Sequence, residues 1–135
     1  MTEQISRGGI RVDISPGELI DKLTILELKL ERISDPAKLA NIRLEYDVLM
    51  DVYGREIVES DALRALTERL KNINAALWEI EDHIREHERA KNFDADFVIL
   101  ARSVYRTNDE RSAVKRAINE LLASKIIEEK SYAAY

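Results

Sequence analysis

The chain contains no cysteine among its 135 residues, and this absence excludes several kinds of chemistry. Disulfide bonds, catalysis by a thiolate and zinc sites built from cysteine all require that side chain. Residues 1–14 also lack the apolar run that a signal peptide or a membrane span would need. We therefore expect a cytoplasmic protein that has no membrane as a partner.

Basic residues are fewer than acidic ones. The chain has 21 lysines and arginines and 26 aspartates and glutamates, for a formal net charge of −5. This balance argues against a general nucleic-acid-binding surface, so we expect no nucleic-acid partner. The apolar fraction is 45%, which is enough for one hydrophobic core at this length. Since no repeat or linker interrupts the pattern, we predict a single domain over residues 1–135, with residues 1–9 mobile.

One long segment shows a regular apolar pattern that the other segments can pack against. Its apolar positions alternate in spacings of three and four, and they are Leu63, Leu66, Leu70, Ile73, Leu77, Ile80, Ile84 and, as the last seam position, His87. Such a heptad seam predicts a long helix that is buried along one stripe. Ser60 or Asp61 is suited to cap its first turn. We expect this helix to be the spine of the domain.

The two prolines of the chain each mark the start of a helix. In residues 15–18, Ser-Pro-Gly-Glu, the serine fits the N-cap, the proline the first turn and the glutamate a capping box. The helix that follows is apolar on two sides, because Ile25 and Leu28 lie off its main seam. It should therefore be sandwiched between layers or shared with another subunit. Residues 34–36, Ser-Asp-Pro, end this helix and begin the next.

The last helical segment contains two start signals. Asp94 is suited to cap a helix, and residues 107–110 repeat the spacing of a capping box inside the helical pattern. This spacing predicts a kink between residues 95–106 and 109–123. Four long helical segments with short connections pack most economically as antiparallel neighbours. The predicted fold is therefore an all-α, antiparallel helical bundle.

The two ends of the chain suggest one exception to this helical pattern. Residues 10–14 alternate apolar and polar side chains and resemble a short strand, which needs a partner for its backbone groups. The other segment able to pair with it is 125–129. The sequence thus predicts a two-stranded ribbon formed by the termini.

A locally basic run near the middle of the last helix is the first candidate site. Its members are Arg102, Tyr105, Asn108, Arg111 and Lys115. A helix start at Asn108 would present free amides to an anion, and arginines donate paired hydrogen bonds to phosphate and carboxylate groups. The run therefore predicts a site for an anionic small molecule. The alternative is that these side chains pair with acidic residues of neighbouring helices.

Acidic residues spaced along helices suggest a second function, a small metal-dependent nucleotide phosphohydrolase. All-α enzymes of that kind gather helix carboxylates around Mg²⁺. The candidates are Glu18 with Asp21, Glu79 with Asp82, and Glu27 with Glu31. Such spacings are also common on exposed helices, where they need no metal.

Residues 83–87 match the zinc pattern H-x-x-E-H, with His83, Glu86 and His87 on one helix face. Peptidases of that kind need a distant third ligand and a sheet that holds the substrate. A solvated helix end is the favoured interpretation here. We therefore assign no metal ligand, no cofactor and no catalytic residue from the sequence.

Trp78 is the only tryptophan, and the heptad pattern places it on the outer face of its helix, beside Ala75 and Ala76. An outward tryptophan on an apolar patch normally has something packed over it. A second subunit or the terminal segments of the chain would cover it. Together with Ile25 and Leu28, Trp78 predicts the interface of a homodimer.

Three stretches resemble an uncharacterised family of small bacterial all-α proteins, a domain of unknown function. They are SPGELIDKLTILELK (15–29), LARSVYRTND (100–109) and EEKSYAAY (128–135). The resemblance spans almost the whole chain and implies a self-standing bacterial domain, without an activity or site residues. The function that the residues favour is binding of a phosphate- or carboxylate-bearing small molecule by a homodimer.

Overall fold

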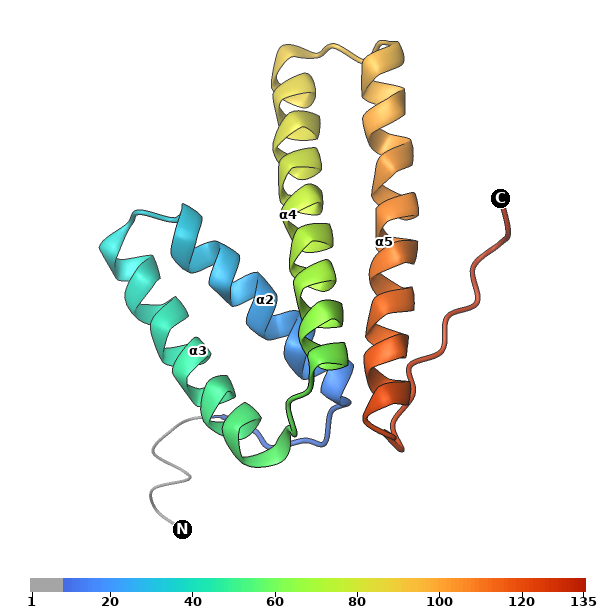
Figure 1. The fold of residues 1–135 in the computed structure, drawn as a ribbon. Helices are drawn as coiled ribbons and strands as arrows, with labels where there is room; N and C mark the ends of the chain where they lie inside the picture. Colours follow the sequence, from blue (N-terminus) through green and yellow to red (C-terminus); the bar gives the residue numbers. More distant parts are fainter. Residues whose placement is uncertain (1–8) are drawn as a thin grey trace.

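The computed structural model describes residues 9–135, and the predicted mobility of residues 1–9 concerns a segment that, apart from Gly9, lies outside them. The described chain forms four α-helices in the order α2 (Pro16–Arg32), α3 (Pro36–Glu56), α4 (Asp61–Ala90) and α5 (Ala95–Leu121) (Figure 1). Short connections join successive helices. The prediction of an all-α helical bundle is confirmed.

Each helix begins at a residue whose side chain satisfies an amide of the first turn. Ser15, Asp35, Ser60 and Asp94 are the four N-caps, and each accepts a backbone hydrogen bond of 3.1 or 3.2 Å. These bonds satisfy amides that have no partner within the helix. The helix starts expected at these four positions are therefore present.

The helices form two antiparallel pairs, α2 with α3 and the longer α4 with α5 (Figure 1). Helix α2 contacts the other three, whereas α3 lies along α2 and reaches the core cluster through Tyr53. The end of α4 and the start of α5 extend past α2 as a two-helix arm, and the connection 91–94 is its tip (Figure 1). None of the described helices has the length and apolar character needed to cross a membrane.

The helix in the middle of the fold is α2, although α4 was the expected spine. Eight of the 17 residues of α2 are buried. The core contains Ile20 from this helix together with Leu63 and Leu70 from α4 and Ile118 from α5. All positions of the predicted seam of α4 are buried or half-buried. The two apolar sides of α2 therefore pack against α3 on one side and against α4 and α5 on the other.

The predicted kink near Thr107 is wrong, because α5 is one continuous helix from Ala95 to Leu121. A capping box begins a helix only where the chain before it is not helical. The inward positions of α5 continue in register through this point, from Val104 to Arg111 and Val114. Packing on both sides of Thr107 thus keeps the helix intact.

The predicted ribbon of the termini is also wrong, since the described residues contain no strand. Ile10 and Val12 are exposed. The segment 125–129 instead runs alongside α5. There, Glu128 lies 3.5 Å from Lys115, and Arg116 donates to Glu129 at 2.8 Å. A strand-like pattern does not specify a partner, and here the acidic side chains of this segment lie beside cations of α5 instead.

Candidate functional site: a buried carboxylate beside an apolar cavity

A buried aspartate joins three helices at one point. Asp21 of α2 is only 1% exposed. Arg111 of α5 donates to both of its carboxylate oxygens, and the bond from Nε to Oδ1 is 3.0 Å long. Asn74 of α4 donates from Nδ2 to the same Oδ1 at 2.9 Å. Because a buried carboxylate is costly without partners, these donors are what permit a charge at this position.

Thr24 completes this network within α2. Its hydroxyl donates to the backbone carbonyl of Asp21 at 2.8 Å and accepts from Asn74 Nδ2 at 3.0 Å. Among the described residues, every buried side-chain nitrogen and oxygen has a hydrogen-bond partner. A fully satisfied network of this kind holds its members in one geometry. The guanidinium of Arg111 is thereby fixed in position.

A second ion pair lies one helical turn away. The Nζ of Lys115 donates to Glu18 Oε2 at 2.7 Å and lies 4.0 Å from Asp21 and 3.5 Å from Glu128. Its side chain is 13% exposed. Burial raises the pKa of Glu18, but the hydrogen bond and charge of Lys115 outweigh it, so this pKa lies below its ordinary 4.5. Burial lowers the pKa of Lys115, and the bond to Glu18 with the charges of Asp21 and Glu18 raises it above 10.5 overall.

Because of the ion pair between Glu18 and Lys115, we expect the folded protein to lose stability in acid. A carboxylate with a lowered folded pKa stabilises the fold above its unfolded value, and this contribution disappears as pH falls through the folded pKa. The raised pKa of Lys115 adds no pH dependence near neutral pH, because its contribution is fully present there and is lost only as pH rises through that higher value. Glu18→Gln should therefore be less stable than the unaltered protein at neutral pH, with a difference that shrinks as pH falls below 4.5 and is lost once pH is below the lowered pKa of Glu18. Urea unfolding over a pH series measures this, and a gap that stayed constant in acid would contradict it.

The first turn of α2 lies directly against α5. The amide of Gly17 donates to Asn119 Oδ1 at 2.7 Å. A Cβ atom at Gly17 would lie 2.5 Å from the carbonyl oxygen of Lys115, which is closer than real Cβ contacts. The absence of a side chain at this position is therefore what allows the two helices to approach.

An apolar cavity of about 330 Å³ that is wide open to solvent lies next to Arg111, between α2, α4 and α5. Its apolar wall consists of Ile25, Leu28, Leu77, Trp78 and Val104. The polar side chains on its surface are Asn74, Glu81, Asn108 and Arg111. The buried network therefore presents one edge to a hollow of a size that holds small molecules.

The structure divides the basic run into two groups. Arg111 and Lys115 pair with acidic residues of α2, as the alternative interpretation expected, and Asn108 and Arg111 line the cavity. Arg102 and Tyr105 are exposed and do not line it. Within the described part of the chain, Asn108 is a mid-helix residue, so the expected free amides are not present there.

The three residues predicted at a dimer interface lie around the same cavity. Leu28 is buried, whereas Ile25 and Trp78 are half-buried. The guanidinium of Arg32 lies 5.6 Å from the centre of a Trp78 ring and covers part of it. The apolar patch noted in the sequence is therefore the wall of a cavity.

The carboxylates considered for a metal site do not converge. Glu18 and Asp21 bind the cations of α5, while Glu27 and Glu31 both lie near Lys71, at 3.4 and 2.6 Å. Glu79 and Asp82 are exposed on α4. Over residues 9–135, no three histidine or acidic side chains are grouped so that they could hold a metal ion.

The residues of the histidine pattern lie in the last turns of α4. His83 is exposed, and His87 Nδ1 lies 3.0 Å from the carbonyl oxygen of Asn92. The ring of His87 also packs near Phe97, with 6.1 Å between the ring centres. These contacts fit a structural role for His87 at the connection of the arm.

Two polar residues of this region, Asn74 and Thr24, were not recognised from the sequence as parts of the site. Asn74 directly precedes the patch of Ala75, Ala76 and Trp78 in the sequence, and it is buried against α2. No local pattern distinguishes Asn74, because other polar residues directly after seam positions, such as Arg64 and Arg85, are exposed.

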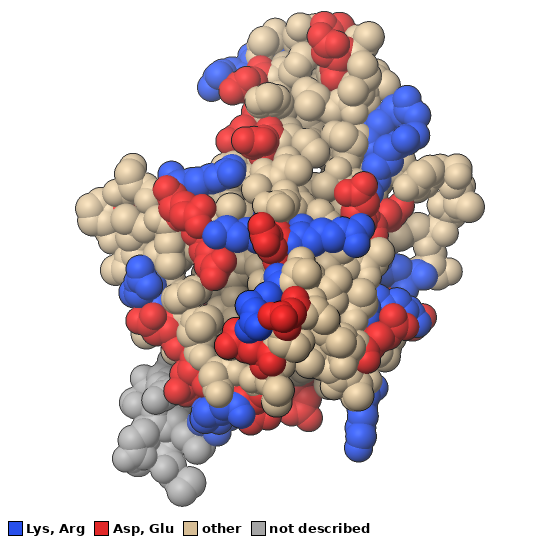
Figure 2. Space-filling model, in the orientation of Figure 1, with Lys and Arg blue, Asp and Glu red and all other residues tan. Residues whose placement is uncertain are grey.

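The surface around these elements carries mixed charge. Figure 2 shows lysine and arginine interspersed with aspartate and glutamate on the face in view, without a large area of one sign.

No curated protein and no solved structure matches this chain. The model of a family of unknown function, DUF6165, matches residues 10–135. This match agrees with the likeness to an uncharacterised domain. The chain belongs to the DUF6165 family.

Proposed function

We propose that the protein binds a small molecule with a phosphate or carboxylate group in the cavity beside Arg111. One observation carries this proposal: the side chain of Arg111 lines the cavity while its Nε and Nη2 donate to Asp21, which fixes the guanidinium in place. A guanidinium has five N–H donors, so this pairing leaves donors for a ligand. The ligand would meet a cation that is already oriented.

The rest of the cavity suits the body of such a ligand. Trp78, Ile25 and Leu77 supply apolar surface, and the amide of Asn108 supplies a polar contact. Asn74 Nδ2 already donates to Asp21 and Thr24, and Glu81 adds a carboxylate to the wall, so Arg111 and Asn108 are the donors for an anionic group. Ligand sites usually combine a mostly apolar wall with a few such groups, in a volume of roughly 300–1,000 Å³. A molecule with one acidic group on a compact apolar body fits this description.

Binding can be followed through Trp78, because it is the only tryptophan and it lines the cavity. Phenyl phosphate and benzoate should change its fluorescence in a saturable way, and inorganic phosphate should do so more weakly. Asn108→Asp should weaken binding of both organic anions by about tenfold or more, since it places a like charge on the cavity wall.

Arg102→Ala is the matched control, because Arg102 lies on the same helix but does not line the cavity. This variant should bind like the unaltered protein. The proposal fails if none of the three probes gives a saturable response, or if Asn108→Asp binds as well as the control.

We do not extend the proposal to phosphate hydrolysis. The carboxylates of α2 nearest the cavity already have Lys115 and Arg111 as partners.

The cytoplasmic location and the homodimer stay predictions. For the homodimer, further support comes from the arm, where Phe93, Val98 and Ile99 are exposed.

A further inference from the structure

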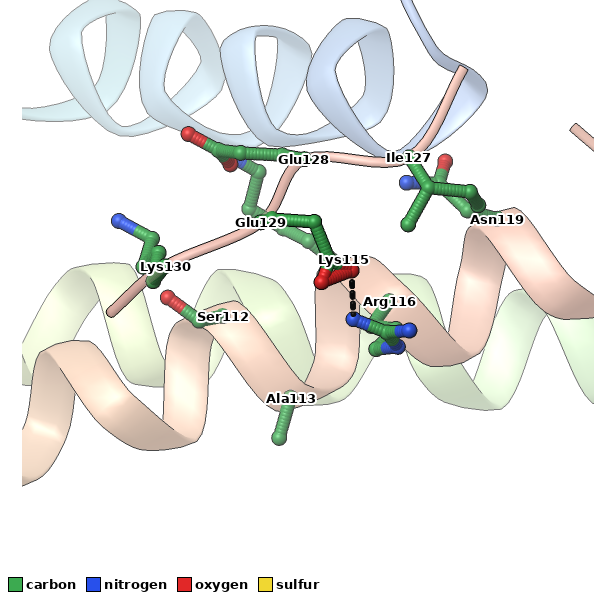
Figure 3. A pocket seen from close by; sticks show the side chains of 9 residues that line it. All are labelled: Ser112, Ala113, Lys115, Arg116, Asn119, Ile127, Glu128, Glu129 and Lys130. Carbon is green, nitrogen blue, oxygen red and sulfur yellow. Dashed lines mark hydrogen bonds and ion pairs between the residues drawn. The ribbon is translucent and has the colours of Figure 1, made fainter. Parts of the chain in front are cut away.

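The segment 124–135, here called the tail, runs back along α5 in the opposite direction (Figure 1). Its acidic part meets two cations of that helix. Glu128 lies 3.5 Å from the Nζ of Lys115, and Arg116 donates from Nη1 to Glu129 at 2.8 Å. Figure 3 shows these side chains between the tail and α5.

The aromatic part of the tail meets a second group of residues on α5. The hydroxyl of Tyr135 donates to Asp109 Oδ2 at 2.5 Å, and its ring packs edge-on against Tyr105 at 5.1 Å between centres. The guanidinium of Arg106 lies 5.7 Å from the centre of the same ring. The tail therefore binds a strip of α5 at two separate places.

These contacts hold the tail by side chains only. Among the described residues, the last backbone bond to α5 is that of the Ser124 amide to the Asn119 carbonyl at 2.8 Å. Glu128, Glu129 and Tyr135 are exposed, and ion pairs in that setting are weak because water competes for both charges. A hollow of about 200 Å³ also remains between the tail and α5 (Figure 3). The tail is thus bound loosely enough to leave.

The turn that folds the tail back is strained. Ala123 has a φ of 54°, in the left-handed region that side chains other than glycine rarely adopt. The sequence from 121 to 130 contains neither glycine nor proline and includes lysine and glutamate, which favour helix. If this turn opens, α5 can continue as helix and carry the tail away from its own strip.

We propose that the strip formed by Tyr105, Arg106, Asp109, Lys115 and Arg116 accepts the tail of a second copy of this chain. The partner segment is identical to the tail already bound there, so its charges and its aromatic ring match the strip. Reciprocal exchange would replace each contact made within one chain by the same contact between two chains. This proposal does not depend on ligand binding in the cavity.

Introduced cysteines can test the exchange cleanly, because the chain has none of its own. Arg116→Cys and Glu129→Cys are made as separate variants, one of them isotopically labelled, and the mixture is oxidised at high protein concentration. Mass spectrometry should find a covalent dimer that contains one chain of each variant. The double variant, oxidised when dilute, should form the same bond within one chain and so checks the geometry.

The control mixture pairs Glu129→Cys with Arg64→Cys, which places the second thiol on an exposed position of α4. The proposal is overturned if the double variant closes but the mixture of Arg116→Cys and Glu129→Cys gives no more mixed dimer than this control. Adding Ala123→Gly to both variants should lower the mixed-dimer yield by about fivefold, because glycine removes the strain of the closed turn. An unchanged yield would contradict the opening of this turn.

Discussion

Asp21→Asn is expected to lower the free energy of unfolding by about 3 kcal/mol, the lower end for removing one partner of a buried ion pair. The substitution keeps the volume of the side chain but removes its charge. Arg111 then stays charged without a neutralising carboxylate, and its side chain is only 29% exposed. Urea unfolding at neutral pH measures the loss.

Two further variants test whether the unpaired charge of Arg111 causes the loss of stability in Asp21→Asn. Glu31→Gln makes the same chemical change on α2 at an exposed ion pair with Lys71, and it should cost less than about 1 kcal/mol. The double variant Asp21→Leu/Arg111→Met removes both charges, so it should recover much of the stability that Asp21→Asn loses. An Asp21→Asn protein as stable as Glu31→Gln would show that the buried pair contributes little.

Gly17→Ala should be comparably damaging, with an expected loss of about 3 kcal/mol, at the upper end for inserting one methyl group into a tightly packed site. The new Cβ would lie 2.5 Å from the carbonyl oxygen of Lys115 and 2.9 Å from Asn119 Oδ1. Because one of these atoms belongs to the backbone of α5, the two helices have to separate. The cluster of Asp21 and Arg111 bridges the same two helices and should loosen with them.

Gly54→Ala is the matched control for this substitution, and its effect should have the opposite sign. No atom lies within 4 Å of a Cβ built at Gly54, which is inside α3. Alanine has the higher helix propensity, so stability should rise by about 0.5–1 kcal/mol. Thermal unfolding of both glycine variants gives the comparison. Equal effects of the two substitutions would mean that the close approach at Gly17 is not important.

The same contacts connect stability to the proposed binding. Arg111 is oriented by Asp21, and Asn74 contacts both this carboxylate and the cavity. A variant that loosens the contact of α2 with α5 should therefore also bind the anionic probes less well. Substitutions on the arm, away from this contact, should leave binding unaffected.

The positions of the helices were determined by the sequence itself. Ser15, Asp35, Ser60 and Asp94 begin the helices because each bonds an amide only two or three residues further along. The heptad spacing of α4 likewise indicates which face is buried, because it depends on helix geometry alone. Such short-range features can be read without knowledge of the partner. The apparent capping box near Thr107 shows the limit, since packing on both sides kept α5 continuous.

The pairing of side chains across the fold was decided only by the tertiary structure. Asp21 and Arg111 are 90 positions apart, and among 26 acidic and 21 basic residues no local pattern selects this pair. The pair forms because α2 lies between α4 and α5, where a carboxylate removed from water needs donors from both helices. For the same reason the cavity walls and the place of the tail along α5 could not be derived from spacing. They depend on which surfaces meet when the helices pack.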